Sequence, residues 1–480
     1  MSKKDVGWVA LFCLIPLLNF PRAILADRTL FLRDIVLVWA PQVDAVISQV
    51  AQGELPWLDA RRGFGQPLFA DPRAEILYPP AWIHLILPKE RSYSLFCAFH
   101  LVIAALGAAR LARRLIPNAS KAAQATAGFA FGAGGPMLSL VSHWHHLAAA
   151  SWMPWILEQT EPREDGRTPW FNVAGLVTLQ FFAGSPDYSF ATFVACALRS
   201  MTRSDQTMKQ RTRTGLALSL GVVMGAIQLL PSLAFSHDAA REALPVGWAL
   251  SPLHPALTLE TVVPFRTDSW PLRPEARLEL LRNAQVWMFS HYLGLSVWVL
   301  ALLGLGYANR RDRRFLCAAL VLGLVVSWGV RSNELQSVIA RIPLVSGLRF
   351  PTKHLILSSL ALAILAAWGV SGFESWGSRS KRWAALFGGF STLAAGLLFA
   401  WSTGPSASVD PTALISPAIA LVATTIILCA QPGRRTRLLL PAAVAIDLLA
   451  GNRTINPTTP ATLLRDRPPL TAFIPKESRI

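Results

Sequence analysis

An aspartate directly after the first apolar segment is the side chain best placed to do chemistry in this sequence. Asp34 follows Arg33 and precedes a stretch, 35–50, whose apolar residues recur at helical spacing on both sides of Pro41. A carboxylate at the membrane surface, partly shielded from water, can act as a general base toward a hydroxyl group. An aspartate here can also cap the helix that follows, a role that the pattern favours and that does not exclude the first.

Cations in two later segments could bind an anionic ligand. Arg349 and Lys353 flank Phe-Pro-Thr just before an apolar run, so both are predicted at the level of the lipid headgroups. There they could hold a lipid phosphate, and ordinary snorkelling at a helix end fits them equally well. Arg266, in a long polar loop, is a weaker candidate of the same kind.

Three histidines and a second aspartate lie in short turns between apolar runs. His143, His145 and His146 could bind a metal or relay protons, but adjacent residues on a helix point in different directions and no carboxylate follows at a fixed ligand spacing. We therefore expect interfacial histidines without a catalytic task. Asp187, in a Gly-Ser-Pro-Asp turn, is a candidate substrate-binding residue that ranks second to the candidate base Asp34, and it could equally cap the next helix.

The composition indicates a polytopic membrane protein. Of 480 residues, 52% are hydrophobic, only 15% are charged and 17 are tryptophan. The net charge of +17 comes from short basic clusters between apolar runs, which is typical of membrane topology and argues against nucleic acid as a partner. The five cysteines show no paired spacing, so they are interpreted as small core residues.

The apolar runs predict an all-α fold of about thirteen transmembrane helices between residues 7 and 450. Alternate loops carry the Lys and Arg residues, which places the N-terminus in the cytoplasm and the long loops 27–88 and 236–286 on the outer side. The expected location is the inner membrane of a bacterial cell, with the active face outside. Few ionisable residues fall near the middle of an apolar run.

These boundaries divide the chain into four parts. An N-terminal transmembrane module, 1–235, contains the first outer loop, 27–88. A long outer loop, 236–286, separates it from a C-terminal module, 287–450. A polar, Pro-rich extracytoplasmic tail, 451–480, completes the chain.

The order of short motifs resembles the YfhO-type bacterial membrane proteins, which look like members of the GT-C glycosyltransferase superfamily. The motifs begin with Asp34 and the helix around Pro41. They continue with Gly-x-x-Pro-Trp at 53–57, Gly-x-Gly-x-Pro at 63–67, Tyr-Pro-Pro at 78–80, Ala-Gly-Ser-Pro-Asp at 183–187, Leu-Arg-Phe-Pro-Thr-Lys at 348–353, Ile-Asp at 446–447 and Asn-Pro at 456–457.

This resemblance implies a GT-C-like membrane enzyme that moves a sugar from a polyprenyl-phosphate donor to an envelope glycolipid or polymer on the outer face. It implies Asp34 as catalytic base or metal ligand. The sequence departs from the pattern at Arg33, where a small residue is expected, and at Trp39, where tyrosine is commoner. It also lacks an Asp-x-Asp pair, so no metal ligand is assigned and a divalent cation stays open as a cofactor.

Two other function classes remain open. A lipid or polysaccharide transporter, or flippase, would need a polar path across the membrane, against which the scarcity of midplane charges argues. A non-catalytic scaffold for envelope assembly would keep the fold without the chemistry. The tail ends without the further outer domain that the resemblance implies, so a short form, one half of a split pair and a truncated chain are all compatible with the sequence.

Overall fold

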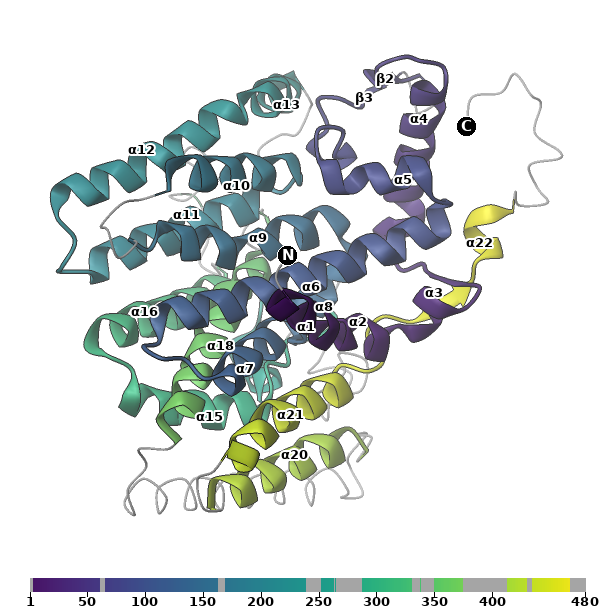
Figure 1. Cartoon of the computed structure of the whole chain (residues 1–480). Helices are drawn as coiled ribbons and strands as arrows, with labels where there is room; N and C mark the ends of the chain where they lie inside the picture. The colour runs from purple at the N-terminus through teal and green to yellow at the C-terminus, as the bar shows by residue number, and fades with distance from the viewer. Residues whose placement is uncertain are drawn as a thin grey trace.

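Helices make up nearly all of the regular structure, as the apolar runs predict (Figure 1). The computed structural model describes residues 3–60, 65–162, 169–238, 252–262, 264, 287–329, 337, 349–373, 412–429 and 434–466. The α-helices are α1 (Lys3–Phe12), α2 (Leu14–Asn19), α3 (Pro21–Leu25), α4 (Ala40–Ala51), α5 (Ile83–Ile86), α6 (Lys89–Leu115), α7 (Lys121–Gly132), α8 (Gly135–Ser139), α9 (Trp144–Thr160), α10 (Trp170–Phe182), α11 (Pro186–Thr202), α12 (Met208–Met224), α13 (Ala226–Asp238), α15 (Leu295–Tyr307), α16 (Arg310–Ser327), α18 (Leu355–Gly372), α20 (Thr412–Cys429), α21 (Arg434–Gly451) and α22 (Thr462–Arg465).

Short helices and strands connect them. A π-helix, η1 (Ile35–Trp39), leads into α4, and 3-10 turns form η2 (Pro72–Ala74), η3 (Pro79–Trp82), η4 (Leu140–Ser142), η6 (Pro255–Thr261) and η7 (Pro351–His354). Strand β1 (Arg28–Leu30) pairs antiparallel with β4 (Thr458–Pro460), and β2 (Leu58–Asp59) pairs with β3 (Gln66–Pro67). The β1–β4 pair joins segments from the two ends of the chain.

Two helices organise the core of the bundle. Helix α6 packs against α7 and α9, and α18 packs against α15, α16 and α7. The α15–α18 contact depends on glycine, because a Cβ on Gly304 would lie 1.9 Å from the carbonyl oxygen of Leu365 and one on Gly369 would lie 2.1 Å from that of Leu300. The two backbones therefore approach closely, as small residues allow between membrane helices.

The first apolar segment differs from its prediction. Residues 7–25 are not one continuous helix but belong to α1, α2 and α3, with breaks at Cys13 and Phe20. Proline supplies the physical reason, because Pro21 opens α3 and Pro16 lies in α2, and neither has an N–H for a helical hydrogen bond.

Two helices of the described part of the chain are long and apolar enough to cross a membrane: α6, and the helix that runs from η7 through α18. A third span results if α12 and α13, which meet at 66°, count as one. Several further apolar helices are shorter. The count of about thirteen spans, the division into modules and the orientation of the chain stay predictions.

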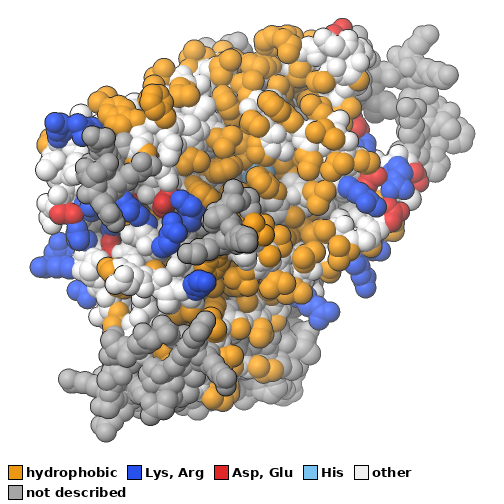
Figure 2. Space-filling model, viewed as in Figure 1, with side chains coloured by type: hydrophobic (Ala, Val, Ile, Leu, Met, Phe, Trp, Pro, Cys, Tyr) orange, Lys and Arg blue, Asp and Glu red, His pale blue; other side chains and the backbone are white. Residues whose placement is uncertain are grey.

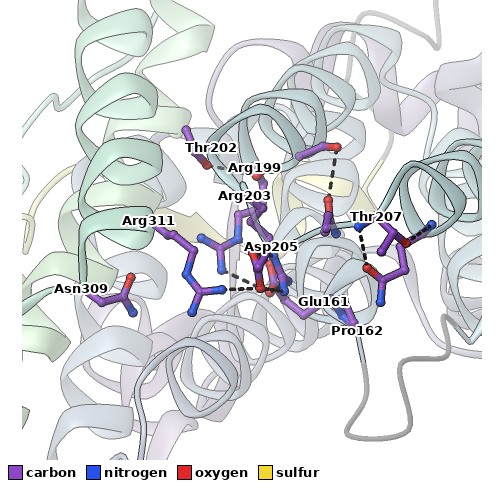
Figure 3. A network of polar contacts seen from close by, with 12 residues as sticks. Glu161, Pro162, Arg199, Thr202, Arg203, Asp205, Thr207, Asn309 and Arg311 are labelled. Carbon is purple, nitrogen blue, oxygen red and sulfur yellow. Dashed lines mark hydrogen bonds and ion pairs between the residues drawn. The ribbon is translucent and has the colours of Figure 1, made fainter.

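Charged side chains collect at the ends of the helices. Figure 2 shows apolar side chains across most of the visible face, with Lys and Arg gathered toward two opposite edges. At one end, Glu161 after α9 binds Arg199 of α11 at 2.5 Å, and Arg199 binds Asp312 of α16 at 2.6 Å. Arg203 and Arg311 extend this network to Asp205 (Figure 3). The opposite ends of α9 and α11 carry the candidate site.

Candidate functional site

Asp34 lies between a strained turn and the π-helix. Arg33 has a φ of +52°, a left-handed conformation that is uncommon outside glycine and that clusters at functional sites. The π-helix then ends at Ala40, whose N–H donates to the carbonyl of Ile35, just before Pro41. Asp34 precedes this helix, but its side chain makes no cap hydrogen bond. The predicted capping role of the carboxylate is therefore wrong, and the carboxylate is 45% exposed.

His143 is an ionisable neighbour of Asp34. Its Nε2 lies 3.9 Å from Oδ2 of the carboxylate. The imidazole itself is buried, and burial lowers the pKa of His143 to about 3, helped by the charges of Arg33 and Lys353. His143 is therefore a neutral side chain near neutral pH.

Trp287 contacts both His143 and Lys353. The indole stacks on the His143 ring at 4.7 Å between centroids and on Phe350 at 5.9 Å. Lys353 Nζ lies 5.2 Å from the centre of the same indole. Two predicted site residues, Asp34 and Lys353, are thus joined through His143 and Trp287.

Lys353 and Asp187, both predicted as substrate-binding residues, bind each other. Lys353 Nζ donates to Oδ2 of Asp187 at 3.0 Å, and both side chains are largely buried. Asp187 lies in the first turn of α11. The cap residue of this helix is Ser185, whose side chain makes no cap hydrogen bond. The pair brings η7 and α11 together, and its charges compensate one another, so Lys353 is not a free cation awaiting a phosphate.

Arg33 is the cation that the sequence reasoning passed over. Its Nη1 donates to the carbonyl oxygen of Trp287 at 3.1 Å, and its guanidinium lies 5.2 Å from the centre of the Phe289 ring. Within the described ranges it forms no ion pair. Burial lowers the pKa of Arg33 and the charge of Asp34 raises it again, although a guanidinium stays protonated.

A segment of the loop between α4 and α5, 71–75, contacts the beginning of two helices that carry site residues. Arg73 binds Asp71 through two nitrogens, at 2.7 and 2.9 Å, and its carbonyl accepts the indole N–H of Trp144 at 3.0 Å. Gly184 meets this segment so closely that a Cβ there would lie 2.2 Å from the carbonyl oxygen of Pro72. The loop is thus held against the beginning of α9 and of α11.

Two ionisable side chains of the 71–75 segment, Arg73 and Glu75, have pKa values that their surroundings raise. Burial lowers the pKa of Arg73, but the hydrogen bond and charge of Asp71 and the charge of Asp34 raise it overall. Glu75, also at a positive φ, is fully enclosed, and its Oε1 has no hydrogen-bond partner among the described atoms. Burial raises the pKa of Glu75 well above its usual value, so we expect an uncharged carboxylic acid there.

Tyr78 anchors the same loop in the core. Its hydroxyl contacts Nε2 of His100 at 2.7 Å and accepts the indole N–H of Trp152 at 2.7 Å. The Tyr78 ring is completely buried, whereas Trp57 and Trp82 of the same loop are about half exposed.

The other predicted site residues are not joined to this cluster. Arg349 is partly buried and makes no hydrogen bond or ion pair with the residues that the structure describes, and Arg266 lies outside them. No group of three His, Cys, Asp or Glu side chains in the described ranges could hold a metal ion. The cluster (Arg33, Asp34, His143, Trp287, Lys353 and Asp187) is called the outer cluster below.

Sequence reasoning missed His143, Trp287 and Arg33 as members of this cluster. For Arg33 a signal existed, because a large basic residue stands directly before the candidate base. For Trp287 there was none, since its contact with His143 spans more than 140 positions of sequence. His143 was considered and assigned no task.

Comparison with known proteins leaves the family open. No family model and no curated protein matches the chain. Two solved structures are similar: ArnT from Cupriavidus metallidurans in the apo state, at 15% identity, and ArnT bound to undecaprenyl phosphate, at 16%. Both have a TM-score of 0.48 and cover 96% of this chain and 77% of theirs. A likeness of this size supports no conclusion about activity, which must be argued from the residues.

Proposed function

We propose that this protein is a membrane glycosyltransferase that moves a sugar from a polyprenyl-phosphate donor to an acceptor at the outer face. The observation that carries the proposal is the state of Asp34. Its carboxylate is half exposed, holds no backbone group and lies against a buried, neutral imidazole. A carboxylate that is free of structural duties and close to enclosed polar side chains is suited to general base catalysis.

The transfer step needs a base and an anion-binding group. The acceptor oxygen forms a bond to the anomeric carbon, while the bond from that carbon to the phosphate oxygen breaks and its electron pair leaves with the phosphate. Asp34 takes the proton of the acceptor hydroxyl. Positioned cations can stabilise the negative charge that develops on the departing phosphate.

Arg33 is the best candidate to hold that phosphate. Among the residues that the structure describes, the Trp287 carbonyl is the only acceptor for its five N–H donors, and no carboxylate pairs with it. Lys353 is already paired with Asp187 at 3.0 Å. It can therefore attract the phosphate through its electrostatic field, or bind it directly by giving up Asp187. We therefore assign the donor phosphate first to Arg33, and keep Arg349 and Lys353 as secondary candidates.

The surroundings suit a lipid donor. One of the two long apolar helices of the described chain begins at the outer cluster, because α18 follows directly after Lys353 and His354. A donor dissolved in the bilayer would present its phosphate at this level, where the leaving group also stays anchored by its lipid tail.

The direct test is transfer of radiolabelled sugar from a panel of polyprenyl-phosphate sugars in vesicles that contain the protein. Asp34→Asn removes the base and keeps the shape of the side chain, so we expect transfer to fall by about 10²- to 10⁴-fold. Asp34→Ala should be equally inactive and equally stable, because the carboxylate caps nothing.

Asp44→Asn is the matched control. Asp44 lies in the neighbouring α4, is 46% exposed and pairs with Lys89 at 2.7 Å, so it resembles Asp34 in exposure but not in surroundings. Its loss should leave transfer within about twofold, as for an exposed ion pair. Equal activity of the Asp34 variants and wild type would contradict the catalytic role, and transfer from no donor would favour a scaffold or transporter.

A further inference from the structure

Asp34 and His143 present two hydrogen-bond acceptors to the same small space. Oδ2 of the carboxylate and Nε2 of the imidazole are 3.9 Å apart, which is too long for a hydrogen bond between them. The Asp34 side chain is 45% exposed, whereas the His143 ring is buried.

The contacts of the other ring nitrogen decide which one carries the proton. Ser142 Oγ has a single proton, which it donates to the carbonyl oxygen of Ser139 at 3.2 Å. Its 3.0 Å contact with Nδ1 of His143 therefore requires a proton on Nδ1. In a neutral ring, Nε2 is then a bare lone pair that faces the carboxylate.

The charges around His143 keep the ring neutral. Arg33 and Lys353 lower the pKa of His143 after burial itself, and the neighbouring His145 and His146 are buried as well. Asp34 is the opposing charge, 3.9 Å away and half exposed to solvent. His143 is thus poised to accept a hydrogen bond rather than to take up a proton.

We propose that Asp34 and His143 form a two-acceptor subsite for two neighbouring hydroxyl groups of a polyol, which belong to the acceptor substrate. A hydroxyl carries one proton and can satisfy one acceptor only. Two adjacent hydroxyls can each donate over about 2.7–2.8 Å to acceptors that are 3.9 Å apart. This assignment of an acceptor class rests on the proposed transfer function, whereas the tautomer and the diol binding do not.

In this subsite, Asp34 and His143 have different roles in the transfer step. The hydroxyl that donates to Asp34 is the nucleophile, and its proton ends on the carboxylate as the new bond to the anomeric carbon forms. The second hydroxyl keeps its proton and is held by Nε2 of His143. Asp34 is then the catalytic residue, and His143 a positioning residue that orients the acceptor.

The tautomer can be measured on the full chain without any activity. Protein labelled with 15N-histidine is studied by NMR in lipid nanodiscs, and the signal that disappears in His143→Gln is assigned to His143. The expected signal is that of a neutral ring with its proton on Nδ1. A proton on Nε2 would overturn the proposal, because only one acceptor would then remain.

The ligand class is tested on the same signal with two isomeric probes. With 1,2-propanediol, whose hydroxyls are adjacent, we expect a saturable shift of the Nε2 resonance that is lost in Asp34→Ala, which removes both acceptor oxygens of the side chain. With 1,3-propanediol, whose hydroxyls are farther apart, we expect a shift at least several times weaker at equal concentration. Equal responses, or no response to either probe, would refute the diol subsite.

A kinetic test separates this inference from the proposed function. His143→Ala should raise the KM for the acceptor about tenfold, the loss of one neutral hydrogen bond, with kcat within about threefold. A lower kcat at unchanged KM would overturn the positioning role. Transfer from no donor, with the diol response intact, would reject the transferase proposal and leave a polyol-binding site.

Discussion

Arg199 joins three helices at the end of the molecule opposite Asp34, and its replacement gives a clear quantitative prediction. Its guanidinium, on α11, binds Glu161 after α9 at 2.5 Å (Figure 3). It also binds Asp312 of α16 at 2.6 Å. All three side chains are buried. Arg199→Met keeps much of the stem and removes the charge, which leaves two buried carboxylates short of a partner.

The magnitude follows from what each carboxylate retains. Breaking a buried ion pair by removing one partner costs about 3–5 kcal/mol. Glu161 keeps Arg203 at 2.6 Å, and Asp312 keeps the side-chain amide of Asn309 at 2.7 Å. We therefore expect the lower end of the range, about 3 kcal/mol of unfolding free energy.

Arg311→Met is the matched control in the same network. Arg311 and its partner Asp205 are 45% and 44% exposed, and an exposed pair is worth about 0–1 kcal/mol. Thermal unfolding in detergent should show a drop of several degrees for Arg199→Met and about 1 °C or less for the control. Adding Asp312→Asn to Arg199→Met should restore part of the loss, because one orphaned charge is removed.

Either of two results would contradict the predicted stabilities of these variants. One is a melting temperature of Arg199→Met equal to that of wild type, which would mean that the buried carboxylates find other partners or become protonated without cost. The other is an equal loss in the Arg311 control, which would mean that burial does not set the strength of these pairs.

Three further predictions concern the outer cluster and its supports. Gly184→Ala should lower the melting temperature and weaken transfer, because its Cβ would meet the Pro72 carbonyl at 2.2 Å and its φ of +82° disfavours alanine. Tyr78→Phe should cost about 1–3 kcal/mol in a denaturation assay, since two buried partners lose their hydroxyl. The free energy of unfolding should fall as the pH drops from about 6.5 toward 3. In that range the unfolded chain takes up a proton on His143, whereas folded His143, with its pKa of about 3, does not. The His143→Gln variant should show a weaker dependence of stability on pH.

Parts of the outer cluster could be predicted from the sequence alone. Asp34 stands out because a carboxylate follows an apolar segment, and Lys353 because a cation precedes one; both signals are local. The capping role was favoured for the same local reason, and the structure overturns it: Asp34 itself has helical φ and ψ values of −64° and −14°, whereas a capping residue is extended, and its side chain makes no cap hydrogen bond. A tertiary contact of the preceding Arg33, with the carbonyl of Trp287, accompanies this conformation.

Pairings between distant segments could not be predicted in this way. Lys353 and Asp187 were both named, but their 3.0 Å contact depends on how α11 packs beside η7, which hydropathy does not specify. Burial also depends on how the helices pack. Tyr78 lies in a loop that is rich in Gly and Pro, yet its side chain is completely inside the core.

The sequence by itself determined the class of this protein: apolar runs of spanning length, basic clusters between them and a helical fold, because the free energy of placing apolar and charged groups relative to lipid depends on composition and spacing alone. Only the tertiary structure decided the chemistry of the candidate site. Whether Asp34 caps or faces His143, whether Lys353 is free or paired, and which ring nitrogen carries a proton all depend on contacts of a few ångströms between segments far apart in the chain. Such contacts arise from packing, where each side chain is fixed by several neighbours at once.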